Sequence, residues 1–90
     1  MMLEDNQIQK KRKEIDDIDC KILSLINKRA KKSLEIRNLK STQNIALYDS
    51  KREEHIIKQL CDINDGPLYN DNVEYLFKEI IKIIRGLPND

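Results

Sequence analysis

The chain is 90 residues long, which suits a single small domain or one subunit of an oligomer. Charged residues make up 37% of it, hydrophobic residues 39% and aromatic residues 4%, with two glycines and two prolines, a composition that favours long helices over a β-sandwich or barrel. The 17 basic and 16 acidic residues leave a net charge of +1, which argues against a nucleic-acid partner because phosphate contacts need a basic excess.

The sequence also argues against a membrane protein, a secreted protein and a metal protein. The mean hydropathy of −0.69 leaves no apolar run long enough to span a bilayer. The first five residues are acidic and lack the apolar core of a signal peptide. Cys20 and Cys61 are far apart and His55 is the single histidine, so we expect unpaired thiols, no metal site and a cytoplasmic location.

Apolar residues at helical spacing predict a first helix over residues 6–41, which no Gly or Pro interrupts. Such a helix is about 52 Å long at 1.5 Å per residue. A compact monomer of this size has a radius of gyration of about 12 Å, so the helix would extend beyond its own domain. We therefore predict an intertwined homodimer, in which a second chain lies along this helix. The apolar stripe consists of Ile8, Ile15, Ile18, Ile22, Ile26, Leu34, Ile36 and Leu39.

Two shorter helices follow in the chain. The second begins at residues 49–50 and ends before residues 64–67, where Gly and Pro come after the last apolar residue. The third begins near residues 70–71, which are good capping residues, and ends at Gly86. Helices of about 35, 15 and 16 residues predict an all-α fold class with a three-helix protomer. We expect a single domain over residues 1–90.

Charged residues lie on the apolar faces of the first two helices. At about 100° per residue, Arg12, Arg29 and Lys40 fall within about 60° of the apolar stripe of the first helix. Arg and Lys are almost never fully buried unless they are paired, so an anionic group is expected to meet them. The first turn of the second helix adds three charged residues on its inward side: Asp49, Arg52 and Glu53.

Each of these charges also has a purely structural explanation. The arginines of the first helix can extend their charged ends into water, and Lys40 can stabilise the C-terminal end of that helix. Ser50 and Glu53 can form a capping box, or Asp49 can cap the helix instead. Arg52 can form a weak surface ion pair. Taken together, four cations and two carboxylates fit better with a pocket for a small polyanion, because arginine binds carboxylates through two parallel hydrogen bonds.

At these positions the sequence resembles the all-helical, type II class of chorismate mutase, and the resemblance covers nearly the whole chain. Four segments in the family's order and spacing carry it. They are residues 12–19, which resemble the signature R-x-x-I-D-x-I-D; residues 22–29 with Ile36 and Lys40; residues 49–54, which resemble D-x-x-R-E; and residues 77–81, which match the start of the last helix signature.

The resemblance implies an isomerase that rearranges chorismate to prephenate, on the route to phenylalanine and tyrosine. The reaction is pericyclic and needs no cofactor, metal or covalent intermediate, so the site would act by positioning and electrostatics. By this resemblance, Lys40 would donate a hydrogen bond to the ether oxygen, where negative charge develops as the carbon–oxygen bond breaks.

The resemblance also implies roles for the other charged residues. Arg29 would bind one substrate carboxylate, Arg12 would reach in from the other subunit, and Arg52 would join the carboxylate-binding group. Asp49 and Glu53 would hold the ring hydroxyl and fix the reactive conformer.

The chain departs from the family pattern near the end of the last helix. Ile84 stands where the family usually has Ser, and Pro88 stands where it usually has Gln or Glu, the second donor to the ether oxygen. Asn89 would replace that donor if the chain turned back. These departures keep three alternatives open: a mutase-like module that binds chorismate or regulates another enzyme, a lyase that splits isochorismate into salicylate and pyruvate, and a helical dimer without a ligand.

Overall fold

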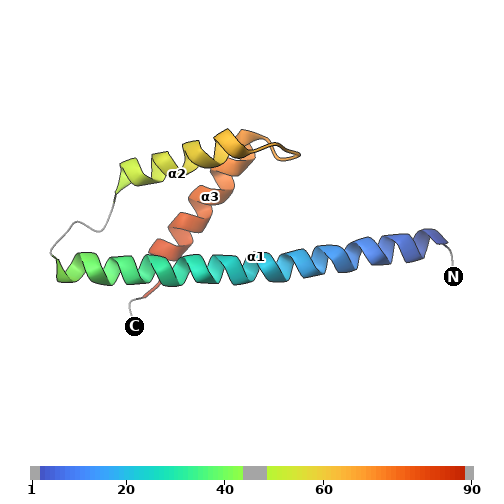
Figure 1. Ribbon diagram of the computed structural model, residues 1–90, viewed down its shortest axis with the longest axis horizontal. Helices are drawn as coiled ribbons and strands as arrows, with labels where there is room; N and C mark the ends of the chain where they lie inside the picture. The colour runs from blue at the N-terminus through green and yellow to red at the C-terminus, as the bar shows by residue number, and fades with distance from the viewer. Residues whose placement is uncertain (1–2, 44–48, 89–90) are drawn as a thin grey trace. The chain divides into compact units, whose positions relative to one another are not determined.

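The computed structural model describes residues 3–43 and 49–88, and these residues form three α-helices. In chain order they are α1 (Leu3–Thr42), α2 (Ser50–Ile63) and α3 (Asn70–Arg85), as Figure 1 shows. The predicted all-α fold with a long first helix is thereby confirmed. The chain divides into two compact units, Met1–Lys32 and Ser33–Asp90, which are described in turn.

The first unit consists of most of α1. Its polar surface carries exposed ion pairs of the kind expected on a solvated helix, such as Lys11 with Glu14 at 3.6 Å. The apolar stripe is not buried by the single chain, because Ile15 and Ile18 are each 54% exposed. Further along α1, inside the second unit, Ile36 and Leu39 are likewise exposed. Each unit therefore has exposed apolar residues on its own part of α1.

Helix α2 begins with an aspartate cap, which is one of the two caps that the sequence allowed. Asp49 is the N-cap, and its side-chain Oδ1 accepts a hydrogen bond from the Arg52 backbone N–H at 3.0 Å. Ser50 is already the first helical residue, so the Ser50–Glu53 capping box is wrong and the alternative cap at Asp49 is confirmed. An aspartate at this position satisfies one of the backbone N–H groups that the first turn leaves without an intrahelical partner.

The loop between α2 and α3 is organised by Asn64, the C-cap of α2. Its side-chain nitrogen donates to the Leu68 carbonyl at 2.8 Å and to Asn70 Oδ1 at 2.9 Å. Its side-chain oxygen accepts from the Gly66 N–H at 3.2 Å. Gly66 has a φ of 83°, a left-handed conformation that glycine adopts without steric cost. The Asn-Asp-Gly-Pro sequence thus ends α2 where it was predicted to end.

Helix α3 packs against α2, and its buried face supplies most of the small core. The buried hydrophobic residues of the second unit are Ile57 on α2 and Val73, Ile81 and Ile84 on α3. Two other apolar residues, Ile63 on α2 and Leu76 on α3, are exposed. The helix ends at Arg85 with Gly86 as its C-cap, as the glycine predicted.

Arg37, near the end of α1, ties that helix to the C-terminal end of α3. Its Nη1 donates to the Leu87 carbonyl at 2.7 Å, and its Nη2 donates to the carbonyls of Ile84 at 3.2 Å and Arg85 at 3.0 Å. Helix C-terminal carbonyls have no intrahelical donor and carry partial negative charge, so a guanidinium is a favourable partner for them. This contact fixes where the last turn of α3 lies within the second unit.

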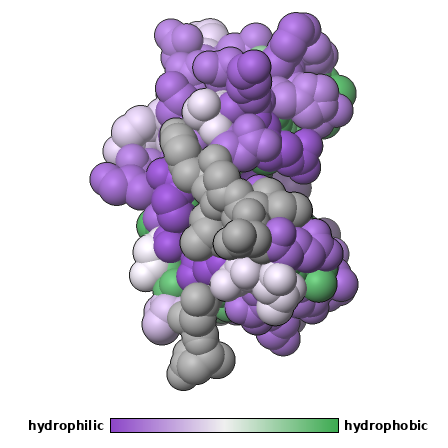
Figure 2. Space-filling model, turned by 90° about the vertical axis from the view of Figure 1, so that its left-hand side faces the viewer, coloured by the Kyte–Doolittle hydropathy of each residue, from purple (hydrophilic) through white to green (hydrophobic). Residues whose placement is uncertain are grey.

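The surface is largely polar. Figure 2 shows a face covered mainly by hydrophilic residues with separate hydrophobic patches between them. In the part of the chain that the structure describes, no helix combines the length and the apolar character that crossing a bilayer requires.

Candidate active site

Two of the predicted site residues, Arg12 and Arg29, lie on the first unit. Arg12 is exposed and Arg29 is half-buried. They are about 26 Å apart along α1 at 1.5 Å per residue. That separation is too large for both side chains of one chain to bind the same small dicarboxylate.

Three further predicted residues, Lys40, Asp49 and Arg52, lie on the second unit. Lys40 is half-buried in the last turn of α1, so its charge also complements the negative end of that helix. Asp49 and Arg52 are exposed and are joined by the N-cap hydrogen bond of α2. The Asp49 carboxylate therefore has a structural role in addition to the predicted contact with a substrate hydroxyl.

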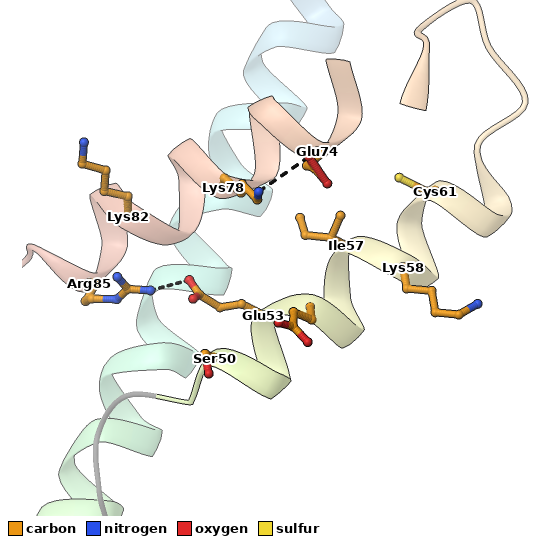
Figure 3. A pocket seen from close by; sticks show the side chains of 10 residues that line it. Ser50, Glu53, Ile57, Lys58, Cys61, Glu74, Lys78, Lys82 and Arg85 are labelled. Carbon is orange, nitrogen blue, oxygen red and sulfur yellow. Dashed lines mark hydrogen bonds and ion pairs between the residues drawn. The ribbon is translucent and has the colours of Figure 1, made fainter. Parts of the chain in front are cut away.

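The sixth predicted residue, Glu53, forms an ion pair that the sequence did not suggest. Its Oε1 accepts from Nη2 of Arg85, which comes from the last turn of α3. The Glu53 side chain is 26% exposed and that of Arg85 is 49% exposed. The pair links the first turn of α2 to the last turn of α3, as the dashed line in Figure 3 shows.

Glu53 and Arg85 both line a cavity of about 660 Å³ between α2 and α3 (Figure 3). Its volume is in the range of sites that bind small molecules. Among the predicted site residues that the structure describes, Glu53 alone lines this cavity. The lining combines Ile57 and Cys61 with charged and polar side chains: Ser50, Glu53, Glu54, Lys58, Glu74, Lys78, Lys82 and Arg85.

Two of the cations lining the cavity are paired with carboxylates of their own helix. Lys58 contacts Asp62 at 3.0 Å on α2, and Lys78 contacts Glu74 at 3.6 Å on α3. The guanidinium of Arg85 instead reaches across from α3 to α2. The ion pair of Arg85 with Glu53 thus crosses this cavity from one helix to the other.

The end of α3 has the departures from the family pattern that the sequence indicated. Ile84 is 4% exposed and belongs to the hydrophobic core, so it presents no polar group to a ligand. Pro88 follows the end of the helix and is exposed. Asn89, the alternative donor, lies outside the described residues.

The roles of Arg37 and Arg85 were missed by the sequence analysis. Arg85 looked like an ordinary cation in the last turn of a helix, a position where basic residues are common. Arg37 lies about 40° from Ile15 on the helical wheel, on the apolar stripe, but it is within no matched motif. The position of Arg37 on the stripe could have marked it as a cation that needs a partner, whereas the pairing of Arg85 requires the packing of α2 on α3.

Comparison with known proteins gives a consistent result. A family model described as chorismate mutase type II matches residues 11–87. The chain belongs to the type II chorismate mutase family.

A solved chorismate mutase (form II) from Thermus thermophilus is similar to this chain, with a TM-score of 0.88 and 37% identity over 90% of this chain and 92% of that one. The chain is 40% identical over 70 residues to the bifunctional chorismate mutase/prephenate dehydratase of Neisseria gonorrhoeae, and 33% identical over 85 residues to that of Stutzerimonas stutzeri. Those matches cover 78% and 89% of this chain. The chain spans only 19% and 23% of these two relatives' lengths, so the similarity concerns about a fifth of each relative.

Proposed function

We propose that this chain forms an intertwined homodimer that catalyses the rearrangement of chorismate to prephenate. The observation that carries the proposal is the match of residues 11–87 to the type II chorismate mutase model, together with the close likeness to a solved mutase at 37% identity. We further propose that residues 1–90 act as a single mutase domain. The cytoplasmic location remains a prediction from the sequence.

The homodimer is supported by the length and the exposure of α1. Forty residues of helix are about 60 Å long at 1.5 Å per residue, and their apolar stripe is half-exposed in the single chain. A contiguous apolar surface of this kind favours association with another protein surface. A second copy of the chain supplies an apolar surface of the same length and pattern, which suits a two-fold interface.

The spacing of the cations on α1 supports a shared active site. Arg29 and Lys40 fall on the same side of a helical wheel, about 20° apart, and this sequence spacing favours a role for both long side chains at one substrate. Arg12 is too far along the same helix to join them. In an antiparallel pair of α1 helices, Arg12 of the second copy would approach Arg29 of the first.

The proposed chemistry assigns each residue a task that its side chain can perform. Arg29, Arg52 and the second copy's Arg12 bind the two carboxylates of chorismate, and this holds the substrate in its folded, reactive conformer. Lys40 donates to the ether oxygen as negative charge develops there, an interaction that is stronger in the transition state than in the ground state.

The carboxylates of α2 act on the ring hydroxyl. Glu53 accepts a hydrogen bond from it. Asp49 contributes both as the N-cap of α2 and as a neighbouring acceptor, because a carboxylate has lone pairs for about four hydrogen bonds. No metal or cofactor takes part in this scheme, since the rearrangement is intramolecular.

The deciding experiment is to incubate the purified chain with chorismate and identify the product by NMR. We expect prephenate to form, and we expect the Arg29→Ala variant to lose most of this activity. Lys28→Ala is the matched control, because Lys28 is an exposed cation of α1 that lies about 100° around the helix from Arg29. Conversion of isochorismate to salicylate and pyruvate, without prephenate formation from chorismate, would show a lyase instead.

A second candidate function is a module that binds chorismate without converting it. The burial of Ile84 and the position of Pro88 after the end of α3 favour it, because neither residue can supply the second donor to the ether oxygen. Thermal stabilisation by a diacid transition-state analogue, with no turnover, would support this function. Equal stabilisation of the Arg29→Ala variant would contradict both functions.

A further inference from the structure

The ion pair between Arg85 and Glu53 joins two helices at one end of the cavity between α2 and α3. Glu53 is one of the two carboxylates proposed to hold the ring hydroxyl of chorismate. Arg85 belongs to none of the matched motifs and lies three residues before Pro88, in the last turn of α3. The cation thus comes from the same end of the helix where the usual second donor is missing.

Stability alone gives little reason for this pair. Both side chains are partly exposed, and ion pairs of this kind contribute little to folding because water screens them and ordering two long side chains costs entropy. The other cavity cations that pair within their own helices show that such residues have local partners available. A cross-helix pair that involves a substrate-binding carboxylate is better explained by its effect on that carboxylate.

The backbone that carries Arg85 is itself held in place. Arg37 donates to the carbonyl of Arg85 at 3.0 Å and to that of the buried Ile84 at 3.2 Å. The last turn of α3 is therefore fixed to the end of α1 within the same unit. A guanidinium that starts from a fixed backbone can restrict the side chain it contacts, whereas one on a frayed helix end cannot.

We propose that Arg85 is a positioning residue that holds the Glu53 carboxylate in the orientation needed to accept the substrate's ring hydroxyl. The inference rests on the proposed mutase function. The contact with Arg85 involves Oε1, and the carboxylate retains the capacity to accept further hydrogen bonds. Fixing a flexible Glu before the substrate arrives removes an entropy cost that would otherwise weaken binding.

The test compares the steady-state kinetics of Arg85→Gln, Arg85→Lys, Glu53→Gln and the double variant Arg85→Gln/Glu53→Gln. We expect Arg85→Gln to raise KM by about tenfold and to change kcat much less. The reason is that the hydrogen bond from the ring hydroxyl to Glu53 has similar strength in the bound substrate and in the transition state. Arg85→Lys should recover part of the loss, since it restores the charge. In the Glu53→Gln background, Arg85→Gln should cause no further rise in KM, because its effect passes through Glu53.

The matched control is Lys82→Gln, which removes an exposed cation lining the same cavity and should leave KM unchanged. Equal losses for Lys82→Gln and Arg85→Gln would overturn the proposal, because the effect would then come from the general charge of the cavity. So would additive effects of Arg85→Gln and Glu53→Gln, or an unchanged KM in Arg85→Gln. Melting temperatures measured at one protein concentration should agree among all variants, which excludes loss of folding as the cause.

A failure of the proposed mutase function can be distinguished from a failure of the positioning role. If the native chain does not convert chorismate, the same set of variants is compared by the Kd of a diacid transition-state analogue. A tenfold weaker Kd for Arg85→Gln that disappears in the Glu53→Gln background would support the positioning role in a binding module. Absence of both turnover and analogue binding by the native chain would overturn the function and the positioning role together.

Discussion

Lys40 is the residue at which we expect a single substitution to reduce turnover most. The Lys40→Ala variant should lower kcat by about 10²–10³-fold, the loss typical of removing one donor from a site where an oxyanion develops. KM should change less, because the charge on the ether oxygen grows mainly in the transition state. The measurement is chorismate consumption at saturating substrate, with prephenate identified as the product.

The matched control for this substitution is Lys31→Ala, an exposed lysine of α1 on the side opposite the apolar stripe. It removes the same charge from the same helix and should leave kcat unchanged. A Lys40→Ala variant that folds normally and keeps native kcat would show that Lys40 does not stabilise the developing charge. A loss confined to KM would instead assign Lys40 to substrate binding.

At the scale of the helix, Asp49 decides how α2 begins. Replacing it with Ala removes the acceptor for the Arg52 N–H and should lower the free energy of unfolding by about 1 kcal/mol. Asp49→Asn should retain nearly all of this stability, because Asn is as good an N-cap as Asp. Chemical denaturation of the three proteins at one concentration measures the difference.

The two Asp49 variants also separate capping from catalysis. If Asp49 acts only as a cap, activity follows stability, and Asp49→Asn behaves like the native chain in both assays. If its carboxylate also holds the ring hydroxyl, Asp49→Asn is stable but has a raised KM. A fully stable Asp49→Ala variant would contradict the role of this residue as the N-cap.

At the scale of the whole molecule, the shared active site predicts complementation between two inactive variants. Arg12→Ala and Arg29→Ala should each lose activity as homodimers. When the two are mixed and allowed to exchange subunits, half of the dimers contain one chain of each kind. In these dimers one site combines an intact Arg29 with an intact Arg12 from the other chain, so about a quarter of native activity should return. Activity is measured before and after exchange.

Two observations check that this recovery comes from dimer exchange. Ile22→Asp, which places a charge on the apolar stripe of α1, should give a monomer by light scattering and abolish the recovery when present in either variant. Ser24→Asp, which places the same charge on the opposite side of the helix, should leave the dimer intact. No recovery between exchanging dimers of Arg12→Ala and Arg29→Ala would mean that both arginines act within one chain or at different sites.

The helices and the family could be predicted from the amino-acid sequence alone. Unbroken apolar periodicity over α1, the Asn-Asp-Gly-Pro turn after Ile63 and Gly86 after Arg85 act over a few neighbouring residues, so their consequences can be read without knowing the packing. The motifs around Arg12, Arg29, Lys40 and Arg52 could likewise be read directly, because they depend on residue type and spacing.

The partners of the charged side chains, in contrast, depend on how the helices pack. The competition between Ser50 and Asp49 for the cap of α2 was undecided in the sequence, because both residues suit that position. The pairing of Glu53 with Arg85 joins positions 32 residues apart. It exists because α3 packs on α2 and Arg37 anchors the end of α3. Contacts of this kind depend on where whole helices lie, and local sequence preferences do not encode that placement.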